Sequence, residues 1–126
     1  MTDPTTEFFE ELRARGHEPR VRQATGTLRF ELKRGRTIDR WLVSIAKGDV
    51  TVVHRGGPAD CIVRADRALF DRLASGELNG VAAVLRGELV AEGDLKLLVL
   101  FQRLFPGKPP TAAGKRARAG YARRRS

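Results

Sequence analysis

Five consecutive apolar residues, 97–101, set the strongest limit on how this chain packs. Asp94 stands before them at the position of a helix cap, and the pattern predicts a helix over 95–104. At 100° per residue, five adjacent apolar side chains cover nearly the whole circumference of a helix, whereas a surface helix has a single apolar stripe. A second surface must therefore cover this helix. That surface is more of the core, a second copy of the chain, or a ligand in an apolar cavity or groove.

The segment before this helix predicts a strand, two short helices and another strand. The strands are expected at 60–65 and 88–92. Asp66 is placed to cap the first helix, which ends at Gly76, and Asn79 is placed to cap the second.

The first half of the chain predicts one helix and a meander of strands. A helix is expected over 7–15, with acids near its start and bases near its end, as the helix dipole favours. Strict alternation of apolar and polar residues predicts a strand over 27–33, and two more strands follow at 41–46 and 50–53. The sequence therefore predicts an α+β domain, a mainly antiparallel five-stranded sheet with helices covering one face.

Composition divides the chain of 126 residues into one domain and a basic extension. We expect a flexible N-terminus at 1–6, a domain at 7–105 and a disordered tail at 106–126, which is poor in large apolar residues. The net charge of +9 is uneven, because residues 1–105 hold 17 bases and 15 acids. The tail holds seven bases and no acid: Lys108, Lys115, Arg116, Arg118, Arg123, Arg124 and Arg125.

The location expected from the sequence is the cytoplasm. The single cysteine, Cys61, has no intramolecular partner, and no charged and then apolar leader opens the chain. The longest apolar run has five residues, far fewer than the roughly 20 that span a bilayer.

The sequence carries no recognisable catalytic or metal-binding motif. His17 and His54 are far apart and lack neighbouring ligands at metal spacing, and Cys61 sits in an apolar strand, where a buried inert thiol is expected. We therefore predict a non-enzymatic protein without a cofactor or a metal.

The basic tail is either a solvated extension without a specific partner or a contact for an acidic partner, which its composition does not identify. Each base near an anionic membrane contributes roughly 1 kcal/mol of attraction, and the same bases contact nucleic-acid phosphates without sequence preference. Tyr121 alone makes no stacking platform, so recognition of bases is not supported. Transient contact with anionic membranes is the expected role, and nucleic acid remains the alternative.

A series of landmarks follows in fixed order along 7–106. They are Trp41 and Val43 in a central strand, Gly48 in a hairpin, the run 59–63, Asp66, Phe70, Leu73, Gly76, Leu78, Asn79, Ala82, the run 87–89, Gly93, Asp94 and the leucine-rich last helix. In these features the chain resembles the sterol carrier protein type-2 family of lipid-transfer domains. The resemblance implies that the sheet and helices enclose an apolar tunnel that binds fatty acyl chains, acyl-CoA or sterols without chemistry. The ending Arg-Arg-Arg-Ser implies no peroxisomal address, and family members also occur fused to enzymes.

The residues expected to line such a cavity come from three helices. They are Phe8, Leu12, Val81, Val84, Leu85, Leu97, Leu98, Phe101, Leu104 and Phe105, with Arg86 or Arg103 meeting a ligand head group. The leading hypothesis is a monomeric carrier of lipid or another long apolar ligand. The alternative is a protein-interaction module that uses its apolar last helix, with a filled core and an exposed apolar patch.

Overall fold

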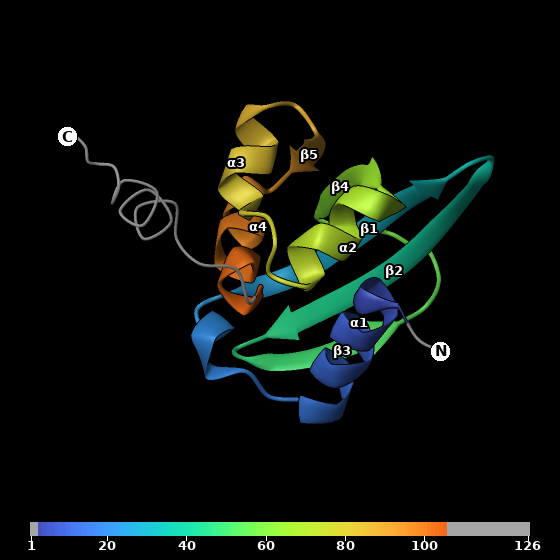
Figure 1. The fold of residues 1–126 in the computed structure, drawn as a ribbon. Helices are drawn as coiled ribbons and strands as arrows, with labels where there is room; N and C mark the ends of the chain where they lie inside the picture. The colour runs from blue at the N-terminus through green and yellow to red at the C-terminus, as the bar shows by residue number, and fades with distance from the viewer. Residues whose placement is uncertain (1–2, 106–126) are drawn as a thin grey trace.

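The computed structural model describes residues 3–105, which contain one five-stranded sheet and four α-helices. Strand β1 lies at the centre of the sheet, whose order is β3-β2-β1-β4-β5 (Figure 1). The strands are β1 (Thr25–Arg34), β2 (Thr37–Ala46), β3 (Asp49–Val53), β4 (Cys61–Asp66) and β5 (Leu89–Gly93). The predicted mainly antiparallel sheet is confirmed, with one parallel pair, β1 and β4, that the sequence did not reveal.

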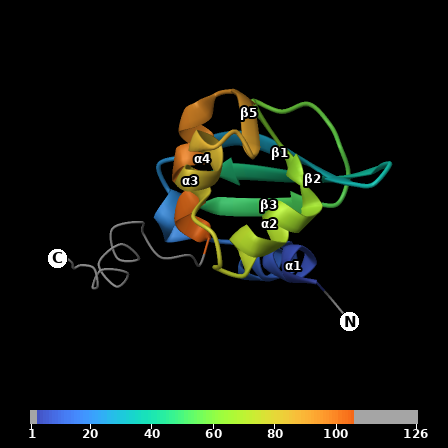
Figure 2. The same cartoon turned by 45° about the horizontal axis from the view of Figure 1, so that its top comes forward.

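The helices pack against one face of this sheet, as Figures 1 and 2 show. They are α1 (Pro4–Arg15), α2 (Arg67–Ala74), α3 (Gly80–Leu85) and α4 (Leu95–Phe101), with short 3-10 helices η1 (Pro19–Val21) and η2 (Gln102–Leu104). Helix α1 contacts β3, while α2 and α4 both contact β1. Two distant parts of the sequence therefore cover the two halves of the sheet.

The alternation of apolar and polar residues in β1 determines which face of the sheet forms the core. Leu28, Phe30 and Leu32 are fully buried beneath the helices, and the register sets Phe30 between Trp41 of β2 and Val63 of β4. Every second residue of a strand points to the same face, so this alternation covers one side of the sheet with apolar groups.

The turns and crossings of the chain explain the sheet order. Lys47 and Gly48 both have positive φ, 53° and 92°, which suits the tight turn between β2 and β3. The chain then crosses the outer face of the sheet to reach β4. There Arg29 Nη1 donates to the carbonyl of Gly57 at 2.7 Å, and the backbone N–H of Thr27 donates to Asp60 Oδ2 at 2.9 Å.

Helix α1 begins at Pro4, three residues earlier than predicted. Asp3 is the cap, and its Oδ1 accepts the backbone N–H of Thr6 at 2.8 Å, so residues 3–6 belong to an ordered helix start. Burial by itself would raise the pKa of Asp3. The hydrogen bonds from Thr6 and Arg67 outweigh it and lower the pKa to about 2.

Other predicted element ends were also wrong. Asp66 precedes α2 as expected, but its side chain makes no capping hydrogen bond. The last helix keeps α-helical geometry only to Phe101, and its final turn tightens into η2. The caps Asn79 and Asp94 are confirmed, since they accept the backbone N–H groups of Ala82 and Lys96. The predicted tail, 106–126, lies outside the described residues.

A buried guanidinium ties three elements together. The side chain of Arg67, at the start of α2, is 8% exposed and donates to Asp3 before α1 and to Asp39 of β2. Asp71, one turn along α2, lies 3.8 Å from its Nε. Because a buried charge is costly without partners, this network fixes the start of α1 against α2 and β2.

Candidate functional site

Aromatic rings fill the space between the sheet and the helices. Phe9 stacks on Trp41 and on Phe70, with ring centroids 4.6 and 5.4 Å apart, and Phe30 lies 5.0 Å from Phe101. These four phenylalanines are fully buried. Such distances are those of close-packed aromatic side chains, so a ligand that enters this space must displace protein groups.

Seven of the predicted lining residues meet in this aromatic core. Phe8 of α1 lies 5.9 Å from Phe101 and 5.1 Å from Phe105, measured between ring centroids, so the first and last helices are in contact here. The seven are Phe8, Leu12, Leu97, Leu98, Phe101, Leu104 and Phe105, and all but the half-buried Phe105 are buried.

The other three predicted lining residues lie at the surface. Val81, Val84 and Leu85 belong to α3, which has only six residues and buries Gly80 and Ala83 against the rest of the domain. A helix this short turns its larger side chains outward when its small residues face the core. Spacing alone did not reveal which face would be inward.

The two predicted head-group residues occupy different places. Arg86 follows α3 and pairs with Glu88, with Nη2 to Oε1 at 3.0 Å. Arg103 lies in η2 against η1, where its Nη1 donates to the carbonyl of Arg20 at 3.3 Å. Arg20 in return donates to the carbonyl of Arg103 at 3.0 Å, which holds the end of the last helix.

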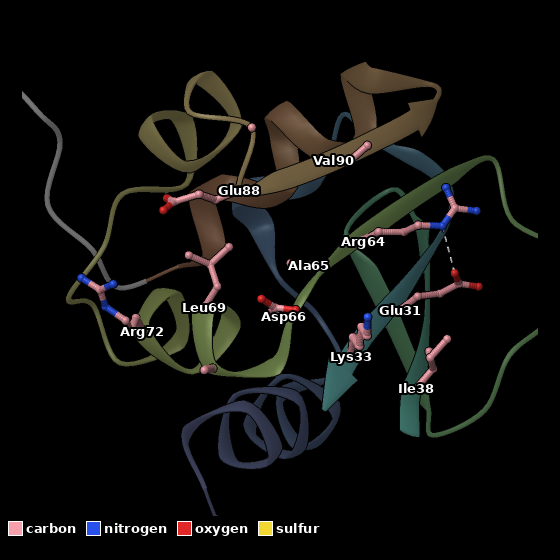
Figure 3. Close-up of a pocket in the computed structure, with 12 residues that line it drawn as sticks. Glu31, Lys33, Ile38, Arg64, Ala65, Asp66, Leu69, Arg72, Glu88 and Val90 are labelled. Carbon is pink, nitrogen blue, oxygen red and sulfur yellow. Dashed lines mark hydrogen bonds and ion pairs between the residues drawn. The ribbon is translucent and has the colours of Figure 1, made fainter. Parts of the chain in front are cut away.

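A cleft of about 640 Å³ opens between α2, β5 and the neighbouring ends of β1 and β4 (Figure 3). Its volume is within the usual range for ligand sites. Leu69 belongs to the core and Ala65 packs against it, so the floor of the cleft is continuous with the interior. The lining residues are Glu31, Lys33, Ile38, Arg64, Ala65, Asp66, Ala68, Leu69, Arg72, Gly87, Glu88 and Val90.

Most charges at this cleft are already paired. Arg64 bridges Glu31 and Glu92 at 3.1 and 2.9 Å. Burial would raise the pKa of Glu31, but the hydrogen bond from Arg64 and the charges of Arg29 and Arg64 lower it. Lys33 forms no ion pair with any residue among 3–105, which leaves its ammonium available to an anionic group at the rim.

Sequence reasoning missed this cleft completely. None of its lining residues is among those predicted to contact a ligand. The alternation did place Glu31 and Lys33 on the outer face of β1, but their meeting with Val90 and Leu69 depends on the parallel pairing of β1 with β4. That pairing joins segments that are distant in sequence.

The other reactive groups within residues 3–105 include a buried thiol, histidines and carboxylates. Cys61 is fully buried, and this burial, together with the nearby charge of Asp94, raises the pKa of its thiol. Residues 3–105 hold no group of three histidine, cysteine or carboxylate side chains placed to bind a metal. Over the same range, no helix is long and apolar enough to cross a bilayer.

Comparison with solved structures shows which proteins share this fold. The chain is similar to the sterol carrier protein 2 of Aedes aegypti in complex with palmitate, with 17% identity and a TM-score of 0.65, covering 82% of this chain and 94% of that one. It is also similar to the UbiJ-SCP2 ubiquinone synthesis protein, with 23% identity and a TM-score of 0.58, covering 79% and 90%. These likenesses show a shared fold.

The same fold occurs within a larger enzyme. The sec-alkylsulfatase Pisa1 from Pseudomonas sp. matches with 23% identity and a TM-score of 0.64, but the match covers 82% of this chain and only 16% of that enzyme. A search of curated proteins gave no match. The model of the SCP-2 sterol transfer family matches residues 8–106, so the chain belongs to that family.

Proposed function

We propose that this protein binds a long apolar lipid, such as a fatty acyl chain, an acyl-CoA or a sterol, and carries it without chemical change. Membership of the SCP-2 sterol transfer family over residues 8–106 carries the proposal. The palmitate complex of a protein with the same fold supports a fatty acyl chain as one ligand. We place this activity in a cytoplasmic monomer.

The cleft is the entrance in this proposal. Its floor residues Leu69 and Ala65 border the core, so an acyl chain that passes between α2 and β5 next meets the aromatic interior. There it contacts the predicted lining residues of α1 and α4, among them Phe8, Leu98 and Phe101. Because rings occupy that space, uptake requires one of the covering helices to move outward.

The estimated free energy of burying an acyl chain agrees with reversible binding. Burying a dozen methylenes gains roughly 10 kcal/mol at about 0.8 kcal/mol each. The ligand's lost translational and rotational entropy and the displacement of core side chains reduce this gain by several kcal/mol. The remaining free energy corresponds to an affinity of roughly micromolar order. A carrier needs such an affinity, because it must release its ligand as well as bind it.

An anionic head group would remain at the rim. Lys33 is a lining cation that has no ion pair among residues 3–105, and Arg86 reaches the rim through its partner Glu88, which lines the cleft. Arg103 lies against η1, so it could contact a head group only if the ligand emerged at the C-terminal end of the last helix.

Native mass spectrometry of the purified full-length protein tests the proposal, followed by extraction of whatever is released on denaturation. We expect one lipid per chain, or uptake of a fluorescent fatty acid by a bare monomer. Leu98→Asp should abolish this uptake, and unchanged uptake in a folded Leu98→Asp variant would remove Leu98 from the site.

A milder pair of substitutions tests the entrance. Ile38→Gln with Val90→Gln changes two partly exposed cleft residues and should weaken fatty-acid binding severalfold while the fold persists. The control is Leu95→Gln with Val99→Gln on α4, outside the cleft, which should bind the fatty acid normally.

One observation favours a second candidate function. The core is filled by rings while α3 and α4 expose apolar side chains, as a protein-interaction module would. A bare dimer in native mass spectrometry, without uptake of fatty acid, would support that module over the carrier.

A further inference from the structure

The exposed apolar side chains of this protein are gathered on one pair of helices. Of the seven large hydrophobic residues exposed within 3–105, two line the cleft, and the other five are on α3 and α4. Their exposed fractions run from 37% to 81%: Val81 48%, Val84 37%, Leu85 81%, Leu95 52% and Val99 62%. We call these five residues the α3–α4 face.

Two observations place α3 and the last helix next to each other. Leu95, Val99 and Gln102 follow one another at helical spacing on the same side of the last helix. The side chain of Gln102 lies against Gly80 at the start of α3, where a Cβ would be 3.1 Å from its Oε1. Figures 1 and 2 both show α3 beside α4.

Folding does not account for this surface. The opposite side of α4, with Leu97, Leu98 and Phe101, is already buried in the core. Apolar side chains gathered on a surface usually mark a site of contact with another molecule.

The charges around the α3–α4 face suit an anionic partner. Lys96, on α4, forms no ion pair with any residue among 3–105. The neighbouring acids are engaged, since Glu88 pairs with Arg86, Glu92 pairs with Arg64, and Asp94 caps α4. The sequence then continues from η2 into the segment 106–126, with seven bases and no acid.

We propose that the α3–α4 face docks on the surface of anionic phospholipid bilayers. The five apolar side chains enter the boundary between head groups and acyl chains, and Lys96 and the bases of 106–126 contact the phosphates. Apolar residues beside a basic segment provide the two signals that stable binding to such a surface needs. This docking goes beyond ligand binding and does not depend on where the ligand sits.

Co-sedimentation of the full-length protein with vesicles tests the docking. We expect binding to phosphatidylcholine vesicles that contain phosphatidylglycerol, and little binding to phosphatidylcholine alone. Leu95→Gln with Val99→Gln should weaken binding at least about tenfold, because two apolar groups no longer leave water. Both changes are neutral, so they alter apolarity and leave the charge as it was.

The cleft pair Ile38→Gln with Val90→Gln is the matched control, because it replaces two apolar residues elsewhere that are also about half exposed. It should bind vesicles normally and bind fatty acid severalfold more weakly. The α4 pair, Leu95→Gln with Val99→Gln, should bind fatty acid normally and vesicles more weakly. Because the two variants should lose different activities, the comparison distinguishes failure of the docking surface from failure of the proposed carrier function.

Glutamine in place of Arg123, Arg124 and Arg125 tests the basic segment. Each neutralised base should weaken vesicle binding roughly fivefold, and added salt should have a similar effect.

Three results would overturn the proposal. The first is that the Leu95→Gln, Val99→Gln variant binds vesicles as well as the unmodified protein does. The second is equal binding to neutral and anionic vesicles. The third is a dimer abolished by the α4 pair together with no vesicle binding, which would identify the face as a contact between two copies.

Discussion

Helices α1 and α4 cover the same face of the sheet, yet their outer surfaces differ. Each turns apolar residues inward, and Phe8 of α1 contacts Phe101 of α4. The outward side of α1 carries Glu10, Glu11 and Arg13, while that of α4 carries Leu95 and Val99. Stability requires only the inner faces, so the apolar outer face of α4 reflects something other than folding.

The two helices also differ in how they are held. The start of α1 is fixed by the cap Asp3 and its ion pair with buried Arg67. Beyond its cap, the end of the last helix is held by the exchange of hydrogen bonds between Arg20 and Arg103, and both of these residues are exposed. We therefore expect α4 to open more readily than α1 when a ligand enters.

Removal of a ring from the inner face of α1 should have the largest effect. Phe9→Ala is expected to lower the free energy of unfolding by about 3–5 kcal/mol, because it leaves a hole beside Trp41, Phe30 and Phe70. Urea unfolding followed by circular dichroism measures the loss. A change below about 1 kcal/mol would mean that the core is not packed as described.

Overpacking of the inner face of α4 should have the next largest effect. Gly26 has φ 150°, and a Cβ there would lie 2.7 Å from Leu97 Cδ1. Gly26→Ala should therefore cost about 1–3 kcal/mol in unfolding free energy. Hydrogen exchange should show amides of α4 less protected while those of α1 change little. Equal loss of protection in both helices would contradict the difference in how they are held.

Acid should weaken the connection between α1 and η1. The hydrogen bonds from Arg20 lower the pKa of Glu18 from 4.5 to about 2, although burial opposes the shift. A carboxylate whose pKa is lower in the folded state stabilises the fold above pH 4.5, and this stability is lost as the pH falls through about 2.

Glu18→Gln isolates this effect. At pH 7 it should cost about 2 kcal/mol in the free energy of unfolding, typical of hydrogen bonds to a buried charged group. The difference from the unmodified protein should shrink steadily below pH 4.5 in urea unfolding experiments. A difference that does not change with pH would show that Glu18 acts by packing alone.

The smallest effect is expected on the outer face of α4. Val99→Gln should change the unfolding free energy by no more than about 0.5 kcal/mol, since Val99 is 62% exposed. Thermal unfolding measures this. A large loss would mean that the face is needed for folding and would remove the main contrast with α1.

The sequence predicted all five strands because alternation is a local signal, although β2 begins at Thr37, four residues before the predicted start. The buried side of β1 could be predicted without its neighbouring strands, because Leu28, Phe30 and Leu32 alternate with polar residues. The caps Asn79 and Asp94 depend only on the residues that directly follow them. The match of the family model to residues 8–106 agrees with the predicted resemblance.

What the sequence could not show depends on contacts between distant segments. The cleft needs β1, β4 and β5 side by side, and the exposure of Leu85 depends on how α3 rests against the domain. Asp66 has the residue type and position of a cap, but its carboxylate lines the cleft and makes no capping hydrogen bond. Local pattern fixes which residues form an element, and packing decides which of them remain accessible.

The parallel pairing of β1 with β4 also has a kinetic consequence. During synthesis β1 pairs at once with β2 across a short turn, but its other edge stays open until the chain has crossed the sheet and β4 emerges. Leu97, which lies against Gly26, is made later still. Pairings between distant segments slow folding, and an open central strand invites association with other chains. We therefore expect the nascent protein to be most prone to aggregation between the completion of β3 and the arrival of β4.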